Sequence, residues 1–132
     1  MSIRTLATAT AVAATLLAGA GSAYAASTST SLSNGTLYFT AEDGANVTGN
    51  SSLFYSTTKY KKTGGSTVNV YLKLDTSEGI WSSPLKSVSS GQTVSYSFGG
   101  KSIANDAPDC EATGLMDASN GGPYYTPTVS FC

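Results

Sequence analysis

The chain has 132 residues, a formal net charge of −1, no histidine and two cysteines. A nearly neutral chain has little electrostatic attraction for nucleic acid or anionic membranes, so we expect neither as a partner. The lack of histidine excludes Ser-His-Asp and Cys-His catalysis of the usual kind, as well as Cys/His metal sites.

Residues 1–25 have the pattern of a secretory signal peptide. Arg4 is the only charged residue in this stretch, residues 6–20 are apolar and rich in alanine, and Ala23 and Ala25 fit a small-x-small cleavage site. The apolar run is too short and too rich in threonine to span a membrane. We therefore expect a secreted, extracellular protein.

A polar, low-complexity stretch without hydrophobic periodicity opens the mature chain. Such a stretch is either a frayed terminus or a segment that becomes ordered on a partner. We predict a flexible N-terminal arm and take it as the candidate partner-binding segment, followed by a single domain over residues 35–132. The arm consists of Ala26, Ser27, Thr28, Ser29, Thr30, Ser31, Leu32, Ser33 and Asn34.

The most regular alternation of apolar and polar residues lies in residues 66–75. Period-two alternation with β-branched residues predicts a half-buried strand, which we place at the centre of a sheet. The residues on its apolar face are Val68, Val70, Leu72 and Leu74.

Two strands are predicted before this one. Residues 35–41 alternate clearly, whereas residues 53–61 have a less regular pattern, typical of a bulged or edge strand whose lysines protect it against aggregation. Because residues 63–66 form a short Gly-rich connection, we expect residues 53–61 and 66–75 to pair as an antiparallel hairpin.

Shorter strands are predicted after the central one. Ile80 and Trp81 begin a strand that Pro84 must interrupt, because proline has no N–H for a sheet ladder. Trp81 suits core packing, although a sugar-stacking platform or an interface anchor is an open alternative. Residues 92–99 form a further amphipathic strand, and residues 101–108 a loop.

Residues 109–132 form the last predicted hairpin, with its turn at residues 120–123. In an exported chain, Cys110 and Cys132 should form a disulfide, and the parity of Cys132 places it at the strand ends. For a sequence separation of 22 residues, the chain-entropy model gives a stabilisation of about 3 kcal/mol.

Together these elements predict an all-β protein. Residues that favour helices are scarce, and six to eight short strands separated by turns are typical of a small antiparallel β-sandwich, immunoglobulin-like or similar, with a small barrel as the alternative. The predicted sandwich has one disulfide and follows a signal peptide.

We expect a binding protein and not an enzyme. The acidic residues are scattered, and a sandwich of this size leaves little room for a cleft between paired carboxylates. We therefore predict no catalytic residues, no metal site and no cofactor. The first hypothesis is a protein-binding adaptor whose N-terminal arm docks into a groove of its partner. The alternatives are a secreted hydrolase or protease inhibitor presenting residues 119–126, and a carbohydrate-binding module whose surface aromatic contacts are Trp81, Tyr124 and Tyr125.

The C-terminal segment has the pattern C-x-A-x-G-x-M…G-x-x-Y-Y-T-P…C, from Cys110 to Cys132. With the alanine-rich signal peptide and the Ser/Thr-rich arm, it resembles the small secreted adaptor subunits of the Streptomyces umbrella toxin particles. This resemblance implies a non-enzymatic adaptor in an extracellular antibacterial toxin complex. It further implies that the adaptor joins a repeat-containing toxin subunit to a lectin-bearing subunit, with its arm inserted into a cleft of the latter.

Overall fold

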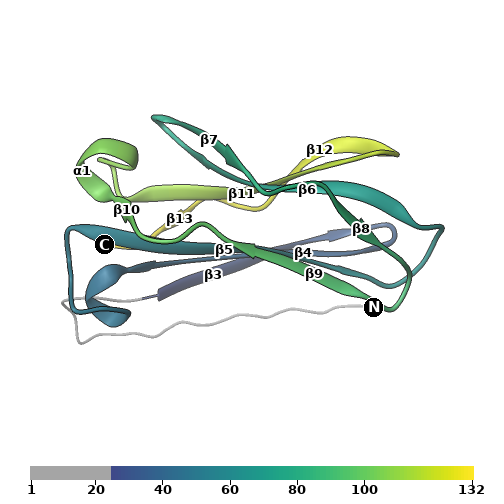
Figure 1. Ribbon diagram of the computed structural model, residues 1–132, viewed down its shortest axis with the longest axis horizontal. Helices are drawn as coiled ribbons and strands as arrows, with labels where there is room; N and C mark the ends of the chain where they lie inside the picture. Colours follow the sequence, from purple (N-terminus) through teal and green to yellow (C-terminus); the bar gives the residue numbers. More distant parts are fainter. Residues whose placement is uncertain (1–24) are drawn as a thin grey trace.

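The computed structural model describes residues 25–132, which fold into two antiparallel sheets packed face to face (Figure 1). Apart from Ala25, the predicted signal peptide lies outside the described residues. The strands of the first sheet are β3 (Ala25–Leu32), β4 (Gly35–Asp43), β5 (Leu53–Lys62), β9 (Thr93–Ser97) and β10 (Lys101–Ser102). The strands of the second sheet are β6 (Val68–Thr76), β7 (Gly79–Ser82), β8 (Lys86–Val88), β11 (Glu111–Ala118), β12 (Gly121–Tyr125) and β13 (Val129–Ser130). The prediction of an all-β sandwich is confirmed.

Both sheets are built around long central strands, with short strands at one margin of the first sheet and at both margins of the second. In the first sheet the order is β10-β5-β4-β3. β10 pairs with the beginning of β5 and β9 with the rest of the same edge. In the second sheet the order is β12-β11-β6-β7, while β13 extends the β12 side and β8 extends the β7 side. The predicted central strand, β6, is therefore internal to its sheet, and the break at Pro84 separates β7 from β8 as expected.

The core lies between the sheets and has two adjoining halves. Each half combines alternate side chains of both sheets, as the period-two patterns of β4 and β6 require. One half consists of Leu37, Tyr60, Val68, Val70, Leu72, Val88 and Met116. The other consists of Phe39, Ala41, Phe54, Leu74, Ala107, Ala112 and Phe131.

Gly114 on β11 allows the sheets to approach closely. A Cβ atom at this position would lie 2.7 Å from the Cβ of Phe39 on β4, which is closer than two such atoms can pack. The glycine inside this predicted strand therefore serves the packing of one sheet on the other.

The predicted hairpin between residues 53–61 and 66–75 is wrong. β5 pairs with β4 on one side and with β9 and β10 on the other, whereas β6 belongs to the second sheet. The Gly-rich connection crosses between the sheets, since Gly65 adopts a positive φ of 76° and the N–H of Thr63 donates to the Asn34 carbonyl at 2.8 Å. The short connection favoured pairing of β5 with β6. Each of the two strands has one buried face, and this pattern does not distinguish strands of one sheet from strands of two packed sheets.

The reading of β5 as an edge strand is also wrong. Its buried face includes Phe54, Thr58 and Tyr60, and the hydroxyl of Thr58 donates to the Lys73 carbonyl at 2.9 Å. Lys62 is only 1 % exposed, with its ammonium donating to the Gly64 carbonyl at 2.5 Å. Because Ser56, Thr58 and Lys62 lie on the inner face of β5, its sequence does not alternate between apolar and polar residues as a central strand usually does.

The prediction of a flexible arm over residues 26–34 is wrong for most of its length. Residues 25–32 form β3, which pairs with β4 from Ala25 opposite Glu42 to Leu32 opposite Gly35. Threonine favours strands, and alternate side chains of β3 are half-buried against the core side of the sheet. The low-complexity composition concealed a regular two-residue period.

The C-terminal hairpin and the disulfide are confirmed. Cys110 and Cys132 are bonded, with Cα atoms 5.6 Å apart, just outside the ends of β11 and β13. The turn lies at residues 119–120 and not at 120–123, because β12 already starts at Gly121 opposite Ala118. Two short helices complete the fold: η2 (Gly44–Asn46) and α1 (Ile103–Asp106), the latter within the predicted loop.

Candidate functional site

The free edge of β3 is the first candidate binding surface. β3 is the terminal strand of its sheet, and within residues 25–132 no strand pairs with its outer edge. Natural proteins usually guard such edges with charges, prolines or bulges, but β3 has none of these and keeps one register over eight residues. The edge is therefore a template of backbone donors and acceptors for an added strand.

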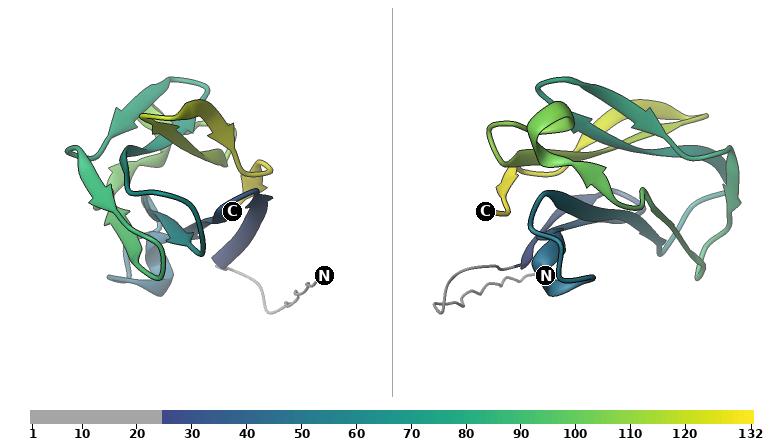
Figure 2. Two further views of the ribbon diagram at one scale, coloured as in Figure 1. Left: turned by 90° about the vertical axis from the view of Figure 1, so that its right-hand side faces the viewer. Right: turned by 60° about the vertical axis from the view of Figure 1, so that its left-hand side comes forward.

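Besides its pairing with β4, β3 contacts β12 and β13 of the second sheet. Leu32 packs against one half of the core, and the Thr30 hydroxyl donates to the Tyr125 carbonyl of β12 at 2.9 Å. On the outer face, the hydroxyls of Ser27 and Thr40 lie 3.3 Å apart. Figure 2 shows β3 beside the C-terminal part of the chain, at one side of the sandwich.

The turn that follows β3 is anchored more firmly. The carbonyl of Asn34 accepts hydrogen bonds from the backbone N–H groups of Thr63 and Gly64, at 2.8 and 3.3 Å, and from the hydroxyl of Tyr60 at 3.4 Å. A small cavity of about 70 Å³ lies beside this turn and is lined by Tyr60 and Tyr124 among others. These contacts fix the C-terminal end of β3 in the fold.

Tyr60 lies in an environment that shifts the pKa of its hydroxyl. Burial raises the pKa of its hydroxyl above the ordinary value of 10.0, and the nearby Tyr124 raises it further. The unfolded chain therefore loses this proton at a lower pH than the folded chain does. The contribution of Tyr60 to stability is complete below about pH 10 and is lost as the pH rises through the raised pKa.

Tyr60→Phe is accordingly expected to reduce the loss of stability at alkaline pH. The measurement is the free energy of unfolding in urea at about pH 8 and about pH 11, compared between the wild type and Tyr60→Phe. Tyr38→Phe is the control, because it removes the hydroxyl of a tyrosine on the outer face of β4, outside both halves of the core. Equal alkaline slopes for the wild type and Tyr60→Phe would contradict the prediction.

The structure does not bring the three predicted surface aromatics together. Trp81 points into the sandwich from β7, where it is half-buried against the core and Lys101 Nζ lies 4.3 Å from its ring centre. Tyr124 is half-buried against the other half of the core, whereas Tyr125 is 50 % exposed on the opposite face of β12. They cannot form one stacking platform.

A groove on the outer face of the second sheet was missed by the sequence reasoning. It has a volume of about 490 Å³ and lies over β6 and β11, beside the connection between β7 and β8. Tyr71 and Lys73 were assigned to the polar face of a strand without reference to any neighbour. Nothing in their spacing indicated that Asp117 would lie opposite Tyr71 and pair with Lys73.

The remaining predicted sites are placed as follows. The segment considered for an inhibitor, residues 119–126, does not protrude as a loop, because Gly121–Tyr125 pairs with β11. Among residues 25–132, no three His, Cys, Asp or Glu side chains are grouped closely enough to hold a metal ion. Within the same part of the chain, no helix has the length and apolar character needed to cross a membrane.

No protein-family model matches the chain, and comparisons with curated proteins and with solved structures find no significant match. The fold itself defines the class: a disulfide-bonded, all-β sandwich protein with an unguarded sheet edge at β3 and a surface groove over β6 and β11.

Proposed function

We propose that the protein is a secreted, non-enzymatic adaptor that binds another secreted protein through the free edge of β3. The observation that carries the proposal is the regular, uncharged edge of Ala25–Leu32, which has no pairing strand on its outer side within the described residues. The lack of histidine supports a role in binding, and the disulfide is typical of an oxidising, extracellular compartment.

The partner is expected to bind by strand addition. An extended segment would pair with the outward-facing N–H and C=O groups of β3 and continue the first sheet by one strand. The hydroxyl side chains of Ser27, Ser29 and Ser31 lie on the outer face of β3 and would contact alternate side chains of the added strand. This mode replaces the insertion of a free arm, because the arm is already paired with β4.

The resemblance to umbrella toxin adaptors suggests which proteins are joined. One partner would be a lectin-bearing subunit and the other a repeat-containing toxin subunit of an extracellular antibacterial complex. If the predicted signal peptide is removed after Ala25, the new N-terminus is Ala26, the second residue of β3, and residues 26–32 keep their edge available to a partner.

Thr28→Pro and Ser29→Pro form a matched pair that tests the edge, and both leave in place the bond from the Thr30 hydroxyl to the Tyr125 carbonyl. Neighbouring residues of an edge strand direct their N–H groups to opposite sides, so one proline removes a bond to β4 and the other removes only an outward donor. Thermal unfolding shows which variant is which, because only the proline that removes a bond to β4 lowers the melting temperature. The fold-neutral variant is expected to weaken partner binding by about five- to tenfold.

Binding is measured by pull-down of the tagged, disulfide-bonded protein from the culture supernatant of its own host, with quantitative mass spectrometry. The wild type is expected to retain specific secreted proteins that the fold-neutral proline variant loses. Thr57→Lys, in the interior of the same sheet on its outer face, is the control. The proposal would be overturned if the edge variant recovered the same secreted proteins as the wild type, or if the wild type were recovered without any partner protein.

A further inference from the structure

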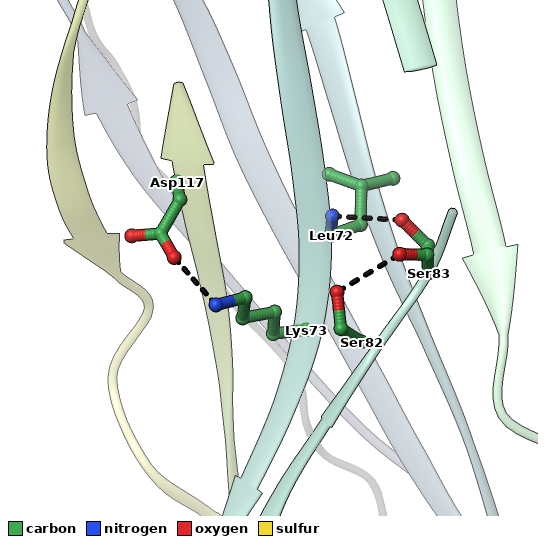
Figure 3. A network of polar contacts seen from close by, with 5 residues as sticks. All are labelled: Leu72, Lys73, Ser82, Ser83 and Asp117. Carbon is green, nitrogen blue, oxygen red and sulfur yellow. Dashed lines mark hydrogen bonds and ion pairs between the residues drawn. The ribbon is translucent and has the colours of Figure 1, made fainter. Parts of the chain in front are cut away.

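The groove on the outer face of the second sheet combines an exposed aromatic ring with paired polar groups. Tyr71 on β6 is 41 % exposed, and Leu85, 54 % exposed, lines the groove from the connection between β7 and β8. Between the strands, Lys73 Nζ lies 2.5 Å from a carboxylate oxygen of Asp117 (Figure 3). The full lining is Asn69, Tyr71, Lys73, Leu85, Asp117, Ala118 and Ser119.

The charges of this lining cancel. Lys73 and Asp117 are the only charged residues in the groove, and their side chains remain 23 % and 41 % accessible to solvent. They therefore offer an N–H donor and an oxygen acceptor side by side without a net charge. Lys73 Nζ also lies 5.9 Å from the ring centre of Tyr71, so that the polar pair and the aromatic ring adjoin.

The groove is held rigidly by the strands that form it. The backbone N–H of Asn69 donates to the Ser119 hydroxyl at 3.1 Å, and the N–H of Ser119 donates to the Asn69 carbonyl at 2.8 Å. On the other side, the N–H of Leu72 donates to the Ser83 hydroxyl at 3.0 Å (Figure 3). The N–H of Ser83 donates to the Leu72 carbonyl at 2.7 Å, just before the chain reaches Leu85. A rigid site loses less entropy when a ligand binds.

We propose that this groove binds an uncharged carbohydrate. The apolar face of a sugar ring would pack on Tyr71, because an aromatic side chain combines a large apolar surface with a polar end. Neighbouring hydroxyl groups of the sugar would accept from Lys73 and donate to Asp117, whose spacing matches two adjacent hydroxyls. A neutral ligand fits because the lining carries no net charge.

The composition of the groove favours a carbohydrate over a protein partner. A protein interface is centred on a desolvated cluster of aromatic or aliphatic anchors, whereas here only Tyr71 and Leu85 are large apolar residues and a solvated ion pair adjoins Tyr71. The volume of about 490 Å³ lies within the range of small-ligand sites. This surface belongs to the second sheet, so the inference is independent of the proposed binding edge on β3.

The test is affinity electrophoresis of the secreted, disulfide-bonded protein in native gels that contain a soluble polysaccharide. The neutral probes are a β-glucan, a galactomannan and glycogen, and polygalacturonate is the anionic probe. We expect retardation by at least one neutral probe, and a loss of about tenfold in affinity for Tyr71→Ala. Tyr71→Trp should retain binding, because it preserves the stacking surface.

Tyr38→Ala is the matched control. Tyr38 lies on the outer face of the other sheet and also has a lysine near its ring, with Lys59 Nζ 4.9 Å from the ring centre, but it does not line the groove. An effect on Tyr38→Ala equal to that on Tyr71→Ala would overturn the proposal, as would retardation by polygalacturonate alone or by none of the probes. If no polysaccharide binds and Tyr71→Ala abolishes recovery of a secreted protein, the groove is a protein interface and the carbohydrate proposal fails.

Discussion

Phe131→Ala is expected to lower the free energy of unfolding by about 3–5 kcal/mol. Phe131 is fully buried next to the C-terminus, and its ring stacks on Phe54 of the first sheet with ring centres 4.7 Å apart. Its backbone N–H donates to the Cys110 carbonyl at 3.0 Å. Truncation would leave a cavity at the point where the C-terminal residues join the two sheets.

Urea unfolding followed by fluorescence measures this loss. Phe131→Leu is expected to cost less than Phe131→Ala, because it removes less apolar volume from the same site. Tyr125→Ala is the control, since this aromatic residue is 50 % exposed and its truncation creates no enclosed cavity. A loss of less than about 1 kcal/mol for Phe131→Ala would show that the core closes without this side chain.

Removal of the disulfide has the second largest expected effect. The variant Cys110→Ser/Cys132→Ser should lose about 3 kcal/mol, because the bond closes a loop of 22 residues in sequence and limits the unfolded chain. A small domain has a total stability of only about 5–15 kcal/mol, so the loss is a large share. The measurement is the urea midpoint of the variant beside that of the wild type.

Two further comparisons make the disulfide prediction specific. The wild type in reducing buffer should unfold at the same urea concentration as the double serine variant. Adding Phe131→Ala to that variant should cost less than the sum of the separate effects, because both changes release the same C-terminal residues. An unchanged midpoint for the double serine variant would mean that the bond does not constrain the unfolded chain.

The elements best predicted from the sequence are those with a local period of two. The alternating apolar residues of β6, the clear pattern of β4 and the pairing of the two cysteines were sufficient to predict a disulfide-bonded sandwich. These features depend on residues close together in the chain or on the redox compartment. They did not require knowledge of which strands are neighbours.

The candidate surfaces were harder to predict for a physical reason. Apart from Leu32, β3 has only alanine, serine and threonine side chains, so its strand conformation depends mainly on hydrogen bonds to β4. The groove requires Tyr71 to lie opposite Asp117, a register between strands more than 40 residues apart. No local pattern encodes such a pairing.

The face that each strand buries follows from its own side chains, and it was evident before the fold was known. Which strand becomes its neighbour does not follow from those side chains, because any two amphipathic strands can satisfy each other's backbone hydrogen-bonding groups. β5 illustrates this: the short connection favoured β6, but β5 pairs with β4 and β9 because their pairing completes a separate inner face. That choice of partner, made by packing between two sheets, left β3 at an edge and created the groove beside Tyr71.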